Sequence, residues 1–359
     1  MDSQQWMALS EKHVAKTYNR YPIVLVKGRG TRVWDVDGKE YLDFVAGLAV
    51  CGLGHSAFDK VFFCNSGAEA NEGAMKLARK YAKEMMGEDR YEIITMDRSF
   101  HGRTFATLTA TAQEKFHKGF SPLMPGFKYV SFNDLDAVRK AVDSKTCAIL
   151  VEPIQGEGGV NCPGSGYLEG LRKICDENGL LLIFDEVQVG MGRTGKLFAY
   201  EHYGIEPDIM TLAKSLAGGV PIGALLMKEA VAEGFKPGDH ASTFGGNPLA
   251  TAAGVAAFQT ILEEGMVENS RDVGAYFLSR LQELAGQFED VREVRGKGLI
   301  LGMELKKEGA SVVKEMLEKG FLINCTMGNV LRFLPPLIVT RQEVDRLIEA
   351  LRDVLGKMG

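Results

Sequence analysis

The sequence predicts an α/β protein built on a mostly parallel sheet, and two patterns support this class. From about residue 60, short apolar runs such as "CAILVEP" and "LLLIFDE" alternate with helical segments such as "YLEGLRKICDENG". These runs are apolar throughout, as expected of strands in a parallel sheet whose two faces are both covered. We expect a large domain over residues 59–288 to contain this sheet.

The two ends of the chain predict smaller structures. Near the N-terminus, "DVDGKEYLDF" is typical of a hairpin with Asp37 and Gly38 at its turn. After residue 290, the runs "LILGMEL", "FLINC" and "VLRFLPPL" precede the helical pattern "RQEVDRLIEALRDVL". We expect one small α+β domain formed from residues 1–58 and 289–359.

Composition limits the functional classes. The chain has 359 residues, of which 45% are hydrophobic and 25% charged, and its net charge is −5, which gives no electrostatic reason to expect nucleic acid or a membrane surface. No apolar run approaches the roughly 20 residues of a membrane span, and the first residues resemble neither a signal nor a transit peptide. The six cysteines form no CxxC pair, and the six histidines have no metal-binding spacing. We expect a cytoplasmic protein with no metal site.

Asp185 and Glu186 end the apolar run "LLLIFDE", and ligands of parallel sheets bind where strands end. A magnesium site of a nucleotide hydrolase requires a GxxxxGK[ST] loop. The nearest match, "GRTGKL" (192–197), lacks the hydroxyl after the lysine and follows the acids. Two other interpretations stay open: a carboxylate that only caps the next segment, or one that pairs with a cationic ring nitrogen of a cofactor.

The cofactor interpretation predicts a lysine at the end of a nearby strand. Lys214 follows the run "PDIMTLA", 29 positions after Asp185, and its neighbours Ala213 and Leu216 are apolar. Most lysines are simply solvated. A buried lysine, in contrast, has a lowered pKa and can form a Schiff base with a carbonyl group.

The segment "VFFCNSGAEANEGAMKLARKY" predicts a strand, a short turn and a helix. Helix N-termini bind anions through their free N–H groups, so this turn is a candidate phosphate site. Ser66 with Glu69 three residues later also fits a capping box, and the two interpretations are compatible. The turn "STFGGNP" (242–248) is a second candidate for contact with a phosphate.

Seven segments in order resemble the class III pyridoxal-phosphate-dependent aminotransferases of fold type I: "NSGAEANE", "SFHGRT", "VEPIQGEGG", "DEVQVGMGRTG", "LAKSLAGG", "STFGGNP" and "LRFLPP". The resemblance covers nearly the whole chain. Within this family, the opening "TYNRYPIVLVKGRGTRVWDVDGKEYLDF" and the Gln in "DEVQ" are most similar to the members that act on N2-acetylornithine.

The resemblance implies an enzyme of arginine biosynthesis that moves the terminal amino group of N2-acetylornithine to 2-oxoglutarate. Ornithine, succinylornithine and 4-aminobutyrate are alternative donors for the same machinery. It also implies a homodimer in which Ser242 and Thr243 serve the partner's site.

The cofactor that the resemblance implies is pyridoxal 5'-phosphate, joined as a Schiff base to Lys214, with Asp185 on its ring nitrogen. A protonated ring is an electron sink, and the freed Lys214 amine would act as general base and acid. The other implied cofactor contacts are Gly67, Ala68 and Thr243 at the phosphate, Phe100 and Val187 on the ring faces, Gln188 near the phenolic oxygen, and Glu186 without an assigned role. On local grounds alone, Phe100 fits a core position equally well.

Two arginines have sequence surroundings that favour carboxylate binding, because a guanidinium fork matches a carboxylate. Arg332 stands inside the apolar "VLRFLPP", and Arg103 follows "HG" in a turn. The resemblance implies that Arg332 binds the α-carboxylate of glutamate and Arg103 the distal carboxylate. With acetylornithine, the carboxylate would bind Arg103, Glu157 would neutralise Arg332, and Ser242 would contact the substrate.

Two other charged residues, Arg193 and Glu152, are predicted to be structural ion-pair residues.

The chain departs from the family pattern after "GLGH" (52–55). The family usually has a long further segment before "DKVFF", but only Ser56, Ala57 and Phe58 intervene here. We expect this segment to exist in the protein as a disordered stretch outside the structure. A true deletion would remove a helix and a loop near the cofactor and the subunit contact.

Overall fold

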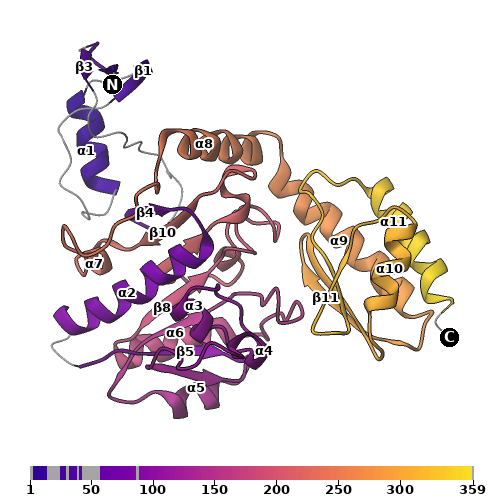
Figure 1. Cartoon of the computed structure of the whole chain (residues 1–359). Helices are drawn as coiled ribbons and strands as arrows, with labels where there is room; N and C mark the ends of the chain where they lie inside the picture. The colour runs from indigo at the N-terminus through magenta and orange to yellow at the C-terminus, as the bar shows by residue number, and fades with distance from the viewer. Residues whose placement is uncertain are drawn as a thin grey trace.

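The computed structural model describes residues 3–13, 25–29, 32–38, 40–42, 57–85 and 89–357. The described strands form three sheets of three, seven and four strands. Figure 1 shows the seven-stranded sheet in the middle of the molecule and the C-terminal unit on one side of it.

The strands of the large sheet have the order β4-β10-β9-β8-β7-β5-β6. They are β4 (Lys60–Cys64), β5 (Glu92–Met96), β6 (Phe127–Val130), β7 (Thr146–Val151), β8 (Leu181–Asp185), β9 (Ile209–Leu212) and β10 (Gly223–Met227). The strands from β9 to β6 are parallel, whereas β10 is antiparallel to both of its neighbours. The predicted α/β class with a mostly parallel sheet is therefore confirmed.

Side chains of strand β8 explain why its sequence is apolar throughout. Leu182 and Phe184 belong to one hydrophobic core, and Leu181 and Ile183 belong to another. Because successive side chains of a strand point to opposite faces, these two cores lie on the two faces of the sheet. Helix α6 (Tyr167–Asn178) covers the first face, and helix α2 (Gly67–Met85) covers the second.

The short elements around this sheet complete the large unit. They are α3 (Phe105–Ala110), α4 (Glu114–His117), α5 (Leu135–Ala141), η1 (Ala199–His202), η2 (Lys214–Ala217) and α7 (Glu229–Ala232). Helix α8 (Pro248–Glu263) follows them and leads toward the C-terminal unit (Figure 1).

The C-terminal unit has its own core under an antiparallel sheet of order β11-β12-β14-β13. Its elements are α9 (Met266–Ala285), β11 (Val291–Lys297), β12 (Ile300–Leu305), α10 (Ala310–Glu318), β13 (Asn324–Thr326), β14 (Val330–Phe333) and α11 (Arg341–Leu355). Phe277 of α9 shares this core with Leu331 and Phe333 of β14. Helix α9 therefore packs with residues beyond the predicted boundary at 288/289, and the division into domains stays a prediction.

The N-terminal elements are α1 (Ser3–His13) and a sheet of β1 (Leu25–Arg29), β2 (Arg32–Asp35) and β3 (Glu40–Leu42). Strands β2 and β3 are antiparallel, with Trp34 opposite Glu40, and Gly38 has a φ of 83° in the connection. The predicted hairpin is confirmed. Figure 1 shows these elements at the upper left, apart from the C-terminal unit at the right, and their union in one small domain stays a prediction.

Among the described helices, none combines the length and the apolar composition that a bilayer crossing requires.

Candidate active site

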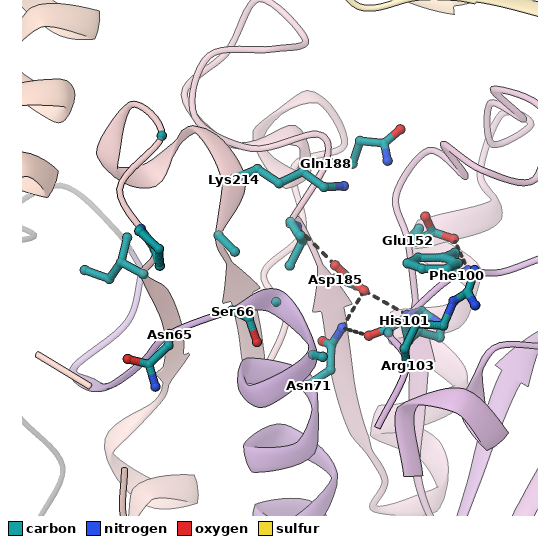
Figure 2. Close-up of a pocket in the computed structure, with 18 of the residues that line it drawn as sticks. Asn65, Ser66, Asn71, Phe100, His101, Arg103, Glu152, Asp185, Gln188 and Lys214 are labelled. Carbon is teal, nitrogen blue, oxygen red and sulfur yellow. Dashed lines mark hydrogen bonds and ion pairs between the residues drawn. The ribbon is translucent and has the colours of Figure 1, made fainter. Parts of the chain in front are cut away.

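A cavity of about 510 Å³ opens where several strands of the large sheet end (Figure 2). Its lining comes from the segments that follow β4, β5, β7, β8 and β9, and from the segment that precedes the antiparallel β10. All of these segments meet at one edge of the sheet, where ligands of open α/β folds bind. The strand end with Asp185, the segment with Lys214 and the turn before α2, which the sequence analysis singled out, therefore lie at one cavity.

Lys214 and Asp185 enter this cavity from neighbouring strands. Strands β8 and β9 pair in parallel with Asp185 opposite Thr211, and Lys214 follows three residues later (Figure 2). Lys214 has a φ of 48°, a strained conformation for a residue with a side chain. Its side chain faces the open cavity, but desolvation still lowers its pKa, an effect that the charges of Asp185 and Glu152 oppose.

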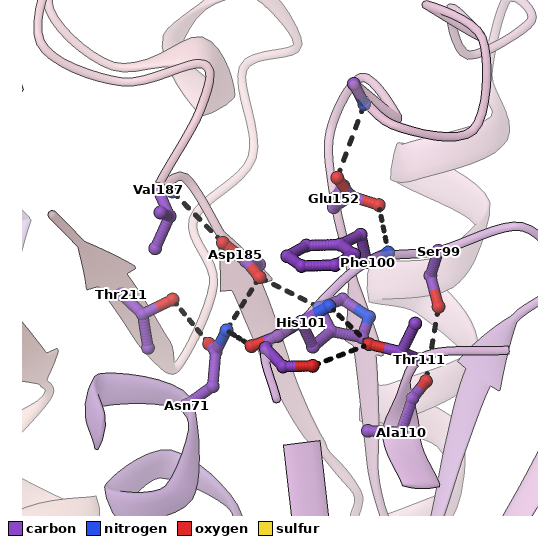
Figure 3. Close-up of polar contacts among 12 residues, drawn as sticks. Asn71, Ser99, Phe100, His101, Ala110, Thr111, Glu152, Asp185, Val187 and Thr211 are labelled. Atoms are coloured by element: carbon purple, nitrogen blue, oxygen red, sulfur yellow. Dashed lines mark hydrogen bonds and ion pairs between the residues drawn. The ribbon is translucent and has the colours of Figure 1, made fainter. Parts of the chain in front are cut away.

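The Asp185 carboxylate is buried and held by three donors (Figure 3). Oδ1 accepts a hydrogen bond from the Val187 N–H at 3.0 Å. Oδ2 accepts one from Asn71 Nδ2 at 2.7 Å and lies 2.8 Å from His101 Nδ1. Asn71 is fixed in turn by the Thr211 hydroxyl, at 2.7 Å, and by the carbonyl of His101, at 2.8 Å. This network fixes the orientation of the carboxylate at the floor of the cavity.

The turn before helix α2 lines the same cavity, and Gly67 and Ala68 are the first two residues of the helix. The first N–H groups of a helix have no intrahelical acceptor, so they are free to bind an anion. One half of the predicted capping box is present, because Ser66 Oγ accepts from Glu69 N at 3.2 Å, whereas the Glu69 carboxylate accepts from the N–H of Asn65, one residue before Ser66, at 2.7 Å. A Cβ at Gly67 would lie 2.8 Å from Val187 Cγ1, so only glycine fits at this approach.

Phe100 and Arg103 line the cavity from the segment after β5. The Arg103 guanidinium lies 4.0 Å from the ring centre of Phe116 and 5.4 Å from that of Phe100. Arg103 is exposed, so its donors are available to a ligand while the aromatic rings support its position.

Arg332 reaches the edge of the site from the C-terminal sheet. It is only 6% exposed, and Leu331 and Phe333 on either side point to the opposite face, into the C-terminal core. Its Nη2 lies 2.9 Å from Glu157 Oε1, and its Nη1 donates to Gln188 Oε1 at 3.0 Å. Of these residues, Gln188 lines the cavity and thus connects it to Arg332.

Glu186 and Thr243 are not among the residues that line this cavity. Both oxygens of the buried Glu186 accept backbone N–H groups of η1, from Ala199 at 2.7 Å and from Tyr200 at 2.8 Å. Its carboxylate is thus bound to η1, and Glu186 is not among the residues that line the cavity. Thr243 is exposed and does not line this cavity, while Ser242 Oγ accepts from Asn65 Nδ2 at 3.1 Å.

The prediction of structural ion pairs for Arg193 and Glu152 is wrong within the described part of the chain. Arg193 donates to the carbonyls of Leu299 and Pro335. Glu152 accepts from backbone N–H groups and lines the cavity.

Sequence reasoning missed His101, Asn71 and Glu152. Asn71 stands three residues after Ala68 on the same helix, a spacing that places both on one face. His101 follows Phe100 directly, but a lone histidine in a turn gave no signal of a buried carboxylate partner. No three described His, Cys, Asp or Glu side chains gather as metal ligands.

The family model described as aminotransferase class III matches residues 56–355 of the chain. An acetylornithine aminotransferase of Caldanaerobacter subterraneus is 54% identical over 97% of this chain and 98% of its own. One of Methanocaldococcus jannaschii is 48% identical over the full length of both chains. The ornithine aminotransferase structure of Toxoplasma gondii superposes with a TM-score of 0.81 at 33% identity, covering 100% of this chain and 96% of that one.

The chain belongs to the class III aminotransferase family. It is a pyridoxal-phosphate-dependent aminotransferase, and the predicted family and enzyme class are confirmed.

The expectation of a segment hidden from the structure is wrong. The alignment with the Methanocaldococcus protein is 396 positions long and takes in the whole of a 359-residue chain, so about 37 positions have a residue only in the relative. The missing segment is thus absent from the chain itself. The predicted junction at His55 lies outside the described residues, and the family match begins at residue 56.

Proposed function

We propose that the protein transfers the terminal amino group of N2-acetylornithine to 2-oxoglutarate, using pyridoxal phosphate bound at Lys214. The observation that carries this proposal is the meeting of Lys214, Asp185 and the first turn of α2 in one cavity, with an arginine–glutamate pair at its edge. The high identity to two proteins named acetylornithine aminotransferase supports the choice of donor.

The residues of the cavity fit this cofactor. The N–H groups of Gly67 and Ala68 would hold its phosphate, and the buried Asp185 carboxylate would face its ring nitrogen. His101 Nε2 is buried with no hydrogen-bond partner among the described residues, while its Nδ1 faces Asp185. Such a site suits a cationic ring, since His101 and Asn71 fix a carboxylate for it. When bound, the cofactor supplies an electron sink that stabilises negative charge on the substrate carbon.

Lys214 has the properties of a proton carrier. Its lowered pKa increases the fraction of neutral amine, and a general base works best when its pKa lies near the working pH. The amine can take a proton from the substrate carbon and return it to a neighbouring atom because the side chain is anchored at a fixed strand end. The Val187 N–H, Asn71 Nδ2 and His101 Nδ1 hold the Asp185 carboxylate in place, where it would face the ring nitrogen.

The two arginines offer separate carboxylate sites. Glutamate would place its α-carboxylate on Arg332, displacing Glu157, and its distal carboxylate on Arg103. Acetylornithine reacts through its terminal amine, so its single carboxylate would bind Arg103 and leave Arg332 paired with Glu157 and Gln188. A buried guanidinium left without an anion is costly, so this internal partner lets one site accept both substrates.

A homodimer is part of the proposal. Helix α8 reads "PLATAAGVAAFQTILE", with no charged residue before its last position. Helices that are apolar on every face are normally buried, yet Leu249 is 74% exposed and Phe244 just before the helix is 71% exposed. A second copy would cover this surface. The exposed Thr243 beside it would then reach the phosphate of the partner's cofactor, with Ser242 next to the partner's substrate.

The test is a comparison of kcat/KM for four amine donors with 2-oxoglutarate as acceptor. We expect N2-acetylornithine to exceed ornithine, succinylornithine and 4-aminobutyrate. A preference for another donor would reject the substrate assignment and keep the enzyme class. A low rate could come from the missing segment or from a wrong substrate. A chimera that receives the corresponding segment of the Methanocaldococcus protein separates these causes, because the insertion raises the rate only if the missing segment is the cause.

A further inference from the structure

Glu152 follows strand β7 and is buried at the cavity wall, 4% exposed. Its two oxygens bind two different segments (Figure 3). Oε2 accepts the N–H of Phe100 at 3.1 Å, and Oε1 accepts the N–H of Gly156 at 3.3 Å. One carboxylate thus links the segment after β5 to the segment after β7.

Each of these N–H groups belongs to a segment with its own part in the site. Phe100 lines the cavity and precedes His101, which holds Asp185. Gly156 precedes Glu157, the partner of Arg332. A Cβ at Gly156 would lie 1.8 Å from Gln188 Oε1, so the backbone position of Gly156 also determines the space for Gln188.

We propose that Glu152 is a positioning residue. Its single carboxylate fixes the backbone at Phe100, which lines the cavity, and at Gly156, next to Glu157, the partner of Arg332. Only a carboxylate fits this task, since it has an acceptor oxygen for each of the two N–H groups, whereas an amide has one oxygen and turns its NH₂ toward the other donor. Burial raises the pKa of Glu152 to about 7, with nearby His101 opposing and Asp185 adding to the rise. Burying an ionisable group costs desolvation free energy, so its presence at this position indicates a role beyond packing. The inference rests on the proposed function.

The kinetic consequence differs between substrates. With glutamate, Arg332 has a substrate carboxylate, so loss of Glu152 acts only through Phe100. With acetylornithine, Arg332 depends on Glu157, so the same change acts through both segments. Glu152→Gln should therefore raise KM for acetylornithine at least about threefold more than KM for glutamate.

A second readout uses the protein without cofactor. Amide hydrogen exchange should become about tenfold faster in a peptide covering residues 98–103 or 155–159 of Glu152→Gln, while the strands β7 and β8 keep their protection. Glu157→Gln is the matched control, because it removes the Arg332 partner and leaves both Glu152 bonds in place. Glu152→Asp, which keeps the charge but is too short to span both segments, should show the same local change.

Unchanged exchange in both segments for Glu152→Gln and Glu152→Asp would overturn the inference, as would equal KM changes for the two substrates. If Glu152→Gln does not fold, Glu152→Asp alone decides by the same criteria. A wild-type protein that transfers no amino group rejects the proposed function, but the exchange measurement still tests the link made by Glu152.

Discussion

Arg332 and Glu157 lie on segments separated by more than 170 positions, and Arg332 Nη2 lies 2.9 Å from Glu157 Oε1. Strand β14 of the C-terminal unit supplies the arginine, and the segment after β7 of the large sheet supplies the glutamate. The pair therefore joins the two units at the edge of the cavity. The guanidinium is nearly buried, whereas the glutamate is 35% exposed, so the glutamate is the partner that can move aside.

Glu157→Gln should separate the two half-reactions. The neutral amide leaves Arg332 ready for a carboxylate, so glutamate should bind at least as tightly as before. The kcat/KM for acetylornithine should fall by about 10- to 100-fold, since a buried charge then lacks its anion. Steady-state kinetics with each donor measures this.

The control for that variant is Glu315→Gln, because Glu315 is also 35% exposed and pairs with Lys357 far from the cavity. Glu315→Gln should leave both donors unaffected. Equal losses for both donors in Glu157→Gln would contradict the role of the pair.

Asp185→Asn should keep the volume of the side chain and lose the charge that faces the ring nitrogen. Removing one preorganised charge at a reacting centre costs about 100-fold or more in kcat. We expect the cofactor to bind and the rate to fall by this amount.

Glu186→Gln provides the contrast, because in the described part of the chain the carboxylate of this adjacent buried acid binds the backbone N–H groups of Ala199 and Tyr200. It should lower the free energy of unfolding by about 1–3 kcal/mol and leave the cofactor spectrum intact. A rate loss in Glu186→Gln as large as that in Asp185→Asn would remove the distinction between the two acids.

Gly156→Ala should displace the Gln188 side chain, since the new Cβ would overlap its Oε1 atom. Arg332 then loses one acceptor, and we expect KM for acetylornithine to rise about three- to tenfold. Adding Gln188→Ala to this variant should cause little further change, because the bond is already lost. Gly164→Ala is the control: its Cβ would meet nothing closer than 3.7 Å. Fully additive effects of the two substitutions would contradict this coupling.

The sequence predicted the class of the fold and most of the cavity, because both depend on local patterns of apolar and turn residues along the chain. Asp185 ends the apolar strand β8 and Lys214 follows the apolar strand β9, and strand ends of a parallel sheet meet at one edge, so their meeting follows from the chain pattern. The turn before α2 is likewise a local signal. The partners of Asp185 were not predictable in this way. His101 and Asn71 lie 84 and 114 positions from it, and only the folded packing brings them together.

Glu186 and Gln188 show that the sequence did not predict which way a side chain points. Both follow strand β8, which ends at Asp185, and the family resemblance implied cofactor contacts for each. The segment turns sharply after the strand, so the Glu186 carboxylate meets the N–H groups of η1 and the Gln188 amide meets Arg332.

His202 should make the protein less stable in mild acid. Burial lowers its pKa from 6.5 to about 4, with nearby Lys297 adding to the effect, and its Nε2 lies 3.1 Å from both the carbonyl and the hydroxyl oxygen of Thr194. Between these pH values the unfolded chain binds a proton that the folded chain does not, so the free energy of unfolding falls as pH falls from 6.5 to 4.

Urea unfolding of the wild type and His202→Gln at pH 7 and pH 5 measures this contribution. The wild type should lose more stability than the variant between the two pH values. An equal loss in both proteins would contradict the contribution of His202.

The most direct test of the account is the absorbance spectrum of the protein reconstituted with pyridoxal phosphate. The wild type should show a visible band that shifts when glutamate is added, and Lys214→Ala should lack this band. Lys173→Ala, a change on the exposed face of α6, should behave as the wild type. A colourless wild type, or an unchanged band in Lys214→Ala, would contradict the central claim that Lys214 holds the cofactor.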